Sequence, residues 1–180
     1  KAEELYNSPR FTLVAFVLIG SMVLIAYSNT FTASFHFDDN PAIVDNYAIK
    51  RMNLDNILQL FKGARPIVSL SLMLNYQLGG INVVGYHIFN ISVHALNSMF
   101  VYLLIHWTLN LPLLVGRYGA RSRRMALFGA LLFAVHPVQT ESVTYIITRT
   151  ELLATFFYLS SFLLFIQGVR KKNFLYHLGA

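Results

Sequence analysis

Residues 11–27 read FTLVAFVLIGSMVLIAY, a run without a single charged side chain. Roughly 20 apolar helical residues cross a hydrocarbon core of about 30 Å, so this run is long enough to form a membrane-spanning helix. Further apolar runs follow it along the chain. The sequence therefore predicts four membrane elements, at Phe11–Tyr27, His87–Trp107, Met125–Val135 and Leu152–Val169. The expected fold class is an all-α, polytopic membrane helix bundle.

The composition also indicates a membrane protein. Hydrophobic residues make up 56% of the 180 residues, whereas charged residues make up only 12%. A soluble domain of this length could not bury so much apolar surface. The chain has no cysteine, which excludes disulfides and thiolate metal sites. Its net charge of +6 comes from basic residues that alternate segments of the chain carry, rather than from one basic patch. We therefore expect membrane lipids and no nucleic acid as partners.

The sorting of charge predicts the topology. The segment before residue 11, residues 108–124 and the segment after residue 169 together carry nine Lys and Arg against two Glu. Residues 28–86 and 136–150, with Glu151 at their edge, carry five basic residues against six acidic ones. Because cytoplasmic loops hold the excess of Lys and Arg, we expect both ends of this segment to be cytoplasmic. Residues 28–86 and 136–150 then form outer segments, and residues 108–124 form a cytoplasmic loop.

The third element is short for a span. Met125–Val135 gives only about 16 Å of helix, roughly half of a bilayer. Either the helix starts earlier, with the preceding arginines extending to the interface, or it ends partway across the membrane. In the second case Pro137 would begin a new helix that runs on to Val169.

The outer loop 28–86 contains two helical stretches. Leu54–Phe61 is amphipathic, which suits a short helix lying in the membrane interface. Ile67–Leu78 is apolar but too short for a span, so we expect a half-buried or re-entrant helix.

An acidic pair, Asp38-Asp39, follows the first span in this loop. Adjacent carboxylates raise the pKa of one of the two, and a carboxylate with such a pKa can act as a general base. Asp39-Asn40-Pro41 is typical of a turn that engages the carboxylate of Asp39 with backbone amides, so Asp38 is the expected base. The alternative is an ordinary solvated loop.

A polar stripe runs along the second span, because the spacing of its members keeps them on one helical face. The stripe consists of His87, Asn90, His94 and Asn97. We expect these side chains to face other helices or a wet cavity and to be structural. The two histidines are about 10 Å apart, too far to share one metal ion. No metal site is predicted, although Mg or Mn on the outer carboxylates is conceivable.

Two arginines on the outer side suit a phosphate, because a guanidinium donates hydrogen bonds in pairs. Arg65 leads into the re-entrant stretch, where the alternative partner is a lipid head group. Arg149 follows an outer segment that also contains His136 and Glu141. Glu141 and Arg149 are about 12 Å apart along a helix, so each needs another partner. A phosphate suits Arg149, and a sugar hydroxyl, a metal or Arg65 suits Glu141.

The ordered motifs resemble a known family. They are FHFDD (35–39), IVDN (43–46), RPIV (65–68), LNYQL (74–78), GYHIFN (85–90), HAL (94–96), FAVHPVQTESV (133–143) and RTELLA (149–154). Together they are similar to the membrane portion of the transmembrane and tetratricopeptide-repeat O-mannosyltransferases and their bacterial relatives. More broadly they resemble the GT-C superfamily of polyprenyl-phosphate-sugar glycosyltransferases.

The resemblance implies a function. It implies inverting transfer of a sugar, mannose in this family, from a polyprenyl-phosphate carrier to a hydroxyl, here protein Ser or Thr, on the non-cytoplasmic face. It places the catalytic acids on Asp38 and Asp39 and the donor-binding groups on Arg65, His136, Glu141 and Arg149. It also implies further spans and a repeat domain outside this segment, in a bacterial inner membrane or the endoplasmic reticulum membrane. Because residue 1 is Lys, we expect a piece of a longer protein. The alternative function is a non-catalytic GT-C-like subunit or scaffold of a larger membrane complex.

Overall fold

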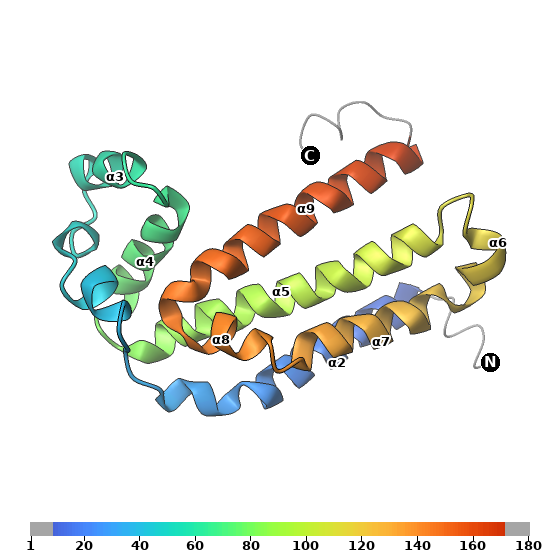
Figure 1. The fold of residues 1–180 in the computed structure, drawn as a ribbon, viewed down its shortest axis with the longest axis horizontal. Coiled ribbons are helices and arrows are strands. Elements are labelled where there is room, and N and C mark those ends of the chain that lie inside the picture. The colour runs from blue at the N-terminus through green and yellow to red at the C-terminus, as the bar shows by residue number, and fades with distance from the viewer. Residues whose placement is uncertain (1–8, 172–180) are drawn as a thin grey trace.

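The computed structural model describes residues 9–171, which are helical and contain no strand (Figure 1). Four helices run along the length of the molecule: α2 (Pro9–Ala26), α5 (Val83–Leu109), α7 (Ser122–Val135) and α9 (Arg149–Lys171). Helix α5 contacts each of the other three. The expected all-α bundle is therefore confirmed, and each predicted apolar element is found as a helix.

Shorter helices complete the bundle at its two ends. They are α3 (Leu54–Phe61), α4 (Pro66–Gly79), α6 (Val115–Tyr118) and α8 (Gln139–Thr144), with the short turns η1 (Ser28–Thr32), η2 (Asn40–Val44), η3 (Tyr47–Ile49), η4 (Gly119–Arg121) and η5 (Ile146–Thr148). Helices α3 and α4 lie at one end of the molecule and α6 at the other (Figure 1). The outer loop and the basic loop of the predicted topology thus lie at opposite ends of the bundle.

Two helical segments of the described chain are long and apolar enough to cross a membrane, Val83–Leu109 and Ile146–Arg170. Helix α2 is apolar but shorter, and the 14 residues of α7 extend about 21 Å. Both expose large apolar side chains, such as Leu13 on α2 and Phe128 on α7, each 67% exposed. Such faces are stable against lipid or against further helices. Membrane crossing by α2 and α7 stays a prediction.

Helix α7 packs through small residues. Ala126, Ala130 and Ala134 recur at every fourth position and are fully buried where α7 contacts α2 and α5. Small side chains let helix backbones approach closely, which is a common basis of packing between membrane helices. The helix begins at Ser122, three residues before the apolar run, and the Ser122 hydroxyl donates to the Gly119 carbonyl of the preceding turn η4 (2.7 Å).

The chain after α7 does not continue as one helix. His136 is extended, with ψ 130°, because a residue before proline is driven out of the helical region. Tyr145 is also extended, with ψ 120°, and it separates α8 from η5 and α9. The Thr148 hydroxyl donates to the carbonyl of Glu141 (3.0 Å), a local bond that competes with helical hydrogen bonding. The alternative of a single helix from Pro137 to Val169 is therefore wrong.

A second apolar cluster holds the outer loop against the start of α5. It includes Met73 of the loop and Ile146 of η5, both fully buried. Helix α4 packs on η3, α5 and α9, which fixes it as part of the bundle. Helix α3 exposes Leu54, Leu58 and Phe61, the apolar face that the sequence assigns to the membrane interface.

The close packing of α7 can be tested with Ala130→Leu. The added side chain has no space at a fully buried position, so we expect a loss of about 1–3 kcal/mol in unfolding free energy. The measurement is unfolding of the purified protein in detergent. Ala154→Leu, at an exposed position of α9, is the matched control and should change stability by less than about 0.5 kcal/mol. Equal losses in both variants would contradict the packing described for α7.

Candidate active site

Asp39 joins the outer loop to the segment that precedes α9. Its side chain is 1% exposed. Oδ1 accepts a hydrogen bond from the backbone N–H of Ile147 (2.9 Å), and Oδ2 accepts one from the N–H of His36 (3.1 Å). Because both oxygens are engaged inside the protein, this carboxylate fixes the position of the loop.

The burial of Asp39 also changes its protonation. Burial raises the pKa of Asp39, while the hydrogen bonds from His36 and Ile147 lower it, and the net pKa lies above the ordinary value. A raised pKa alone would favour a general base. However, an acceptor hydroxyl must reach the carboxylate, and the surface of Asp39 is covered. Asp39 is therefore a poor candidate for the base.

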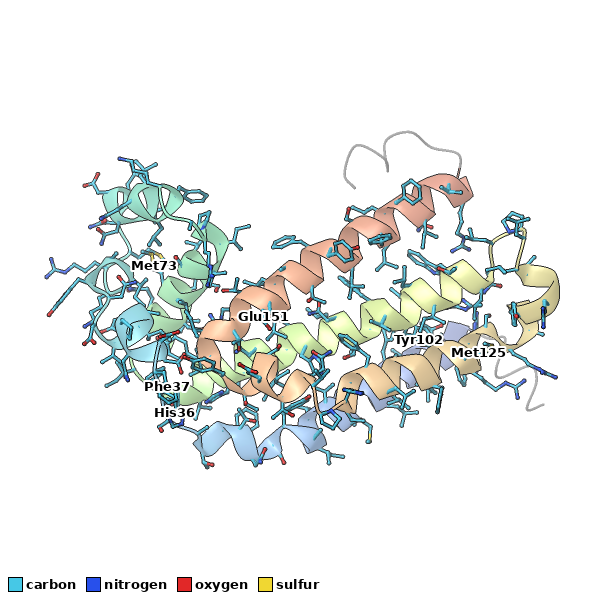
Figure 2. All side chains as sticks on the ribbon, in the orientation of Figure 1. His36, Phe37, Met73, Tyr102, Met125 and Glu151 are labelled. Atoms are coloured by element: carbon cyan, nitrogen blue, oxygen red, sulfur yellow. The ribbon has the colours of Figure 1, made fainter. Side chains whose placement is uncertain are left out.

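Asp38 is exposed, in contrast to Asp39. Its backbone N–H donates to the Tyr145 hydroxyl (3.0 Å), which holds the peptide in place. Its carboxylate has no hydrogen bond or ion pair to any residue between 9 and 171, so both oxygens are open to solvent. Phe37, the residue before it, is 86% exposed and has φ 40°. A non-glycine residue with positive φ stores backbone strain, and such strain is concentrated at functional sites. Figure 2 shows His36 and Phe37 at the α4 end of the bundle.

Arg149 is fully buried beneath this loop. Its guanidinium donates to the Asn90 side-chain oxygen (3.0 Å), the Ser71 hydroxyl (3.1 Å) and the Tyr86 carbonyl (3.3 Å). It also lies over the Phe89 ring, 4.2 Å from the ring centroid. One side chain therefore joins α4, α5 and the start of α9. A phosphate would reach Arg149 only after these bonds were broken.

Arg65 is the exposed cation at this site. It lies immediately before α4, and its Nη1 donates to the Thr150 hydroxyl in a long hydrogen bond of 3.4 Å. The side chain is exposed, and this is its one side-chain hydrogen bond to a residue within 9–171. The structure does not pair Arg65 with Glu141, one of the partners that the sequence left open for that residue.

The four residues of the polar stripe are all fully buried. His87 Nε2 donates to the Ala33 carbonyl (3.2 Å), and His94 Nε2 donates to the Ala134 carbonyl (3.0 Å). Asn97 donates to the Leu152 carbonyl (2.9 Å), and Asn90 lies 3.4 Å from three carbonyls between residues 143 and 146. The stripe therefore binds backbone oxygens where neighbouring helices begin and end.

Glu141 and His136 are exposed near α8. His136 Nδ1 accepts from the Val138 N–H (3.2 Å), so the ring caps the turn that follows α7. Glu141 lines an open pocket together with Glu151, whose Oε2 accepts from the Ser142 hydroxyl (2.7 Å). No three His, Asp or Glu side chains in the described part of the chain are close enough to hold one metal ion.

Sequence reasoning missed several members of this arrangement. Tyr145 contacts Asp38, and Thr150 contacts Arg65. In the sequence, only the hydroxyl groups of Tyr145 and Thr150 could have suggested these contacts. Glu151 was counted as an outer acid but was given no role. Glu151 and Glu141 line one pocket because the chain turns where the helix is interrupted on either side of α8. The spacing of apolar residues in the sequence does not indicate both interruptions.

The buried guanidinium can be tested with Arg149→Lys. An ammonium group cannot replace the planar fork that reaches Asn90, Ser71 and Tyr86 together, so we expect a loss of about 2–3 kcal/mol in unfolding free energy. Arg51→Lys, at an exposed position, is the matched control and should be nearly neutral. Chemical unfolding in detergent measures both, and a neutral Arg149→Lys would contradict the role assigned to these bonds.

Replacing Asp38 and replacing Asp39 should change the unfolding free energy by different amounts. In Asp39→Asn one carboxylate acceptor becomes an amide donor that faces an N–H group, which should cost about 1–3 kcal/mol. Asp38→Asn removes no side-chain hydrogen bond to any residue from 9 to 171 and should cost less than about 0.5 kcal/mol. Thermal unfolding of the two variants side by side measures the difference. A larger loss in Asp38→Asn would reverse the assignment of anchor and free acid.

The chain is 30% identical over 182 residues to Protein O-mannosyl-transferase TMTC4 of Homo sapiens, an alignment that covers 87% of this chain and 23% of the relative. It is 32% identical over 169 residues to Protein O-mannosyl-transferase TMTC3 of Mus musculus, covering 87% and 17%. For Protein O-mannosyl-transferase Tmtc3 of Drosophila melanogaster the identity is 30% over 191 residues, covering 91% and 20%. No family model and no solved structure matches the chain.

These alignments cover most of the chain but only about a fifth of the curated relatives. They bear out the resemblance that the motifs predict. Over most of its length, this chain is a homologue of a part of the transmembrane and tetratricopeptide-repeat protein O-mannosyl-transferases.

Proposed function

We propose that this chain is part of a membrane glycosyltransferase that moves a mannosyl group from a polyprenyl-phosphate carrier to a Ser or Thr hydroxyl of a protein. The observation that carries the proposal is the exposed carboxylate of Asp38, which has no partner within residues 9–171 and lies between the strained backbone of Phe37 and the anchored Asp39. Relatives of this chain are named protein O-mannosyl-transferases, and that name supplies the sugar and the acceptor.

Asp38 acts as the general base in this proposal. The acceptor oxygen attacks the anomeric carbon, and its proton passes to the Asp38 carboxylate. The bond between the anomeric carbon and the phosphate oxygen breaks, and its electron pair leaves with the phosphate. Attack opposite the leaving group inverts the configuration at the anomeric carbon. Asp39 keeps the loop in place during these steps, because its oxygens are engaged by backbone N–H groups.

Arg65 stabilises the departing phosphate. The phosphate gains negative charge as the bond breaks, and a guanidinium with free donors can bind it in pairs. Asp38 and Arg65 are both tied to the short segment from 145 to 150, through Tyr145 and Thr150 respectively, which supports their action on one substrate. His136 and Glu141 then contact the rest of the donor. We assign Arg149 to holding this segment rather than to the phosphate, because its donors are engaged within the protein.

The proposed orientation puts the active face on the non-cytoplasmic side and both ends of this segment in the cytoplasm. The excess of basic residues near α6 and η4, at the end of the bundle away from α3 and α4, supports this orientation (Figure 1).

The general base can be tested with Asp38→Asn in the intact polypeptide. We expect the transfer rate to fall by about 10²–10⁴-fold with normal expression, because the amide cannot take the proton. The assay measures mannose transfer from polyprenyl-phosphate mannose to a Ser/Thr peptide. Asp45→Asn, an exposed acid of the same loop, is the matched control and should retain full activity.

Two outcomes would count against the proposal. Near-normal transfer by Asp38→Asn would remove Asp38 from the chemistry. Absence of transfer by the wild-type polypeptide with every lipid-linked sugar tested would favour the alternative, a non-catalytic membrane subunit or scaffold.

A further inference from the structure

The end of the bundle at which α6 lies carries arginines from four elements. This arginine belt consists of Arg117 of α6, Arg121 of η4, Arg123 and Arg124 of α7, and Arg170 of α9. All of its members except the half-buried Arg123 are exposed. Arg123 and Arg170 both interact electrostatically with His106 in the last turn of α5, so the ends of three helices meet at the belt. Figure 2 shows Met125, the residue after Arg124, at this end of the molecule.

The belt has no acidic counterpart among the described residues at its end of the bundle. Every Asp and Glu from 9 to 171 lies in the outer loop, in α8 or in the first turn of α9, and none occurs between residues 56 and 140. Glu3 and Glu4 lie outside the described residues, and two carboxylates cannot balance the nine Lys and Arg of this side. The remaining negative charge therefore has to come from outside this segment.

Aromatic rings orient two guanidinium groups of the belt. The guanidinium carbon of Arg170 lies 5.6 Å from the centroid of the Trp107 ring on α5, and that of Arg117 lies 5.3 Å from the Tyr118 centroid. A guanidinium that stacks on a ring keeps its N–H edge available for hydrogen bonds. That edge matches the oxygens of a phosphate, to which it can donate in pairs.

The belt also borders exposed apolar surface. Leu113, in the loop between α5 and α6, is 97% exposed. On the helices, Val169 precedes Arg170 and Met125 follows Arg124, and both of these apolar side chains are exposed. Arginines beside exposed apolar side chains favour a ligand that has an anionic head and an apolar body.

We propose that the arginine belt binds the phosphate groups of anionic phospholipids, with Leu113 inserted among their acyl chains. The two helical segments that are long and apolar enough to cross a membrane, Val83–Leu109 and Ile146–Arg170, both end at the belt, which is where head groups would lie. Clustered basic residues next to a spanning helix attract anionic lipids more than zwitterionic ones. A nucleic acid would occupy the arginines but would leave Leu113 in water. The inference does not depend on the proposed reaction, because Asp38 lies at the other end of the bundle.

The test is equilibrium binding of short-chain phosphatidylglycerol and phosphatidylcholine to the intact polypeptide in detergent, with native mass spectrometry to resolve each bound lipid. Each basic residue near an anionic lipid surface contributes about fivefold in affinity, so Arg117→Gln and Arg170→Gln should each weaken phosphatidylglycerol binding by about that factor. Phosphatidylcholine binding should stay the same. Arg51→Gln, which removes an exposed arginine of the outer loop, is the matched control and should bind as the wild type does. Thermal unfolding shows that each variant is folded.

Glycerol phosphate tests the apolar part of the ligand, because it carries the phosphate without acyl chains. We expect it to bind at least about tenfold more weakly than phosphatidylglycerol, since it buries no apolar surface against Leu113.

A preference for phosphatidylglycerol that falls in both belt variants and persists in Arg51→Gln supports the proposal. Equal affinity of the wild type for the two lipids, or unchanged phosphatidylglycerol affinity in both belt variants, overturns it. Binding of glycerol phosphate as tight as that of the lipid would identify a soluble anion as the ligand and would also overturn it.

Discussion

The described structure depends on one buried guanidinium. Arg149 carries a charge into the protein interior, where an unsatisfied ion is unstable. The cost is offset because α4 supplies a hydroxyl, α5 supplies an amide oxygen and a carbonyl, and the Phe89 ring covers the group. Since these partners come from different elements, the first residue of α9 is fixed relative to α4 and α5. The short segment before α9 is fixed with it.

The features of the candidate site follow from that constraint. Asp39 accepts from the N–H of Ile147, two residues before Arg149, so the outer loop attaches to a backbone that is already held. Asp38 then occupies a defined position even though its carboxylate is solvated. An exposed acid on a free loop would sample many positions, and a general base has to lie within hydrogen-bond reach of its proton.

Much of the helical framework could be predicted from the sequence, because uncharged apolar runs leave few alternatives. The turn at Asp39-Asn40-Pro41 also indicated which acid would be engaged by backbone amides, and Asp39 is the engaged one. The burial of Arg149 was not predicted, since its partners are 59 to 78 positions away in the chain. Pro137 made the break at His136 one of two alternatives in the sequence, whereas the break at Tyr145 has no signal in the apolar periodicity, so the shared pocket of Glu141 and Glu151 was not predicted.

The hydrogen bond from the Asp38 amide to Tyr145 has a consequence for the order of events at the membrane surface. Tyr145 precedes Glu151 of α9 by six residues, so Asp38 and the pocket that Glu151 lines are attached to neighbouring parts of the backbone. A ligand that prefers one arrangement of this stretch also sets the affinity of a second ligand at Asp38, and thermodynamic linkage makes the effect equal in both directions. If the proposed base and a second position on this stretch both bind substrate, occupancy of one changes the affinity of the other, with a sign set by the arrangement that each ligand prefers.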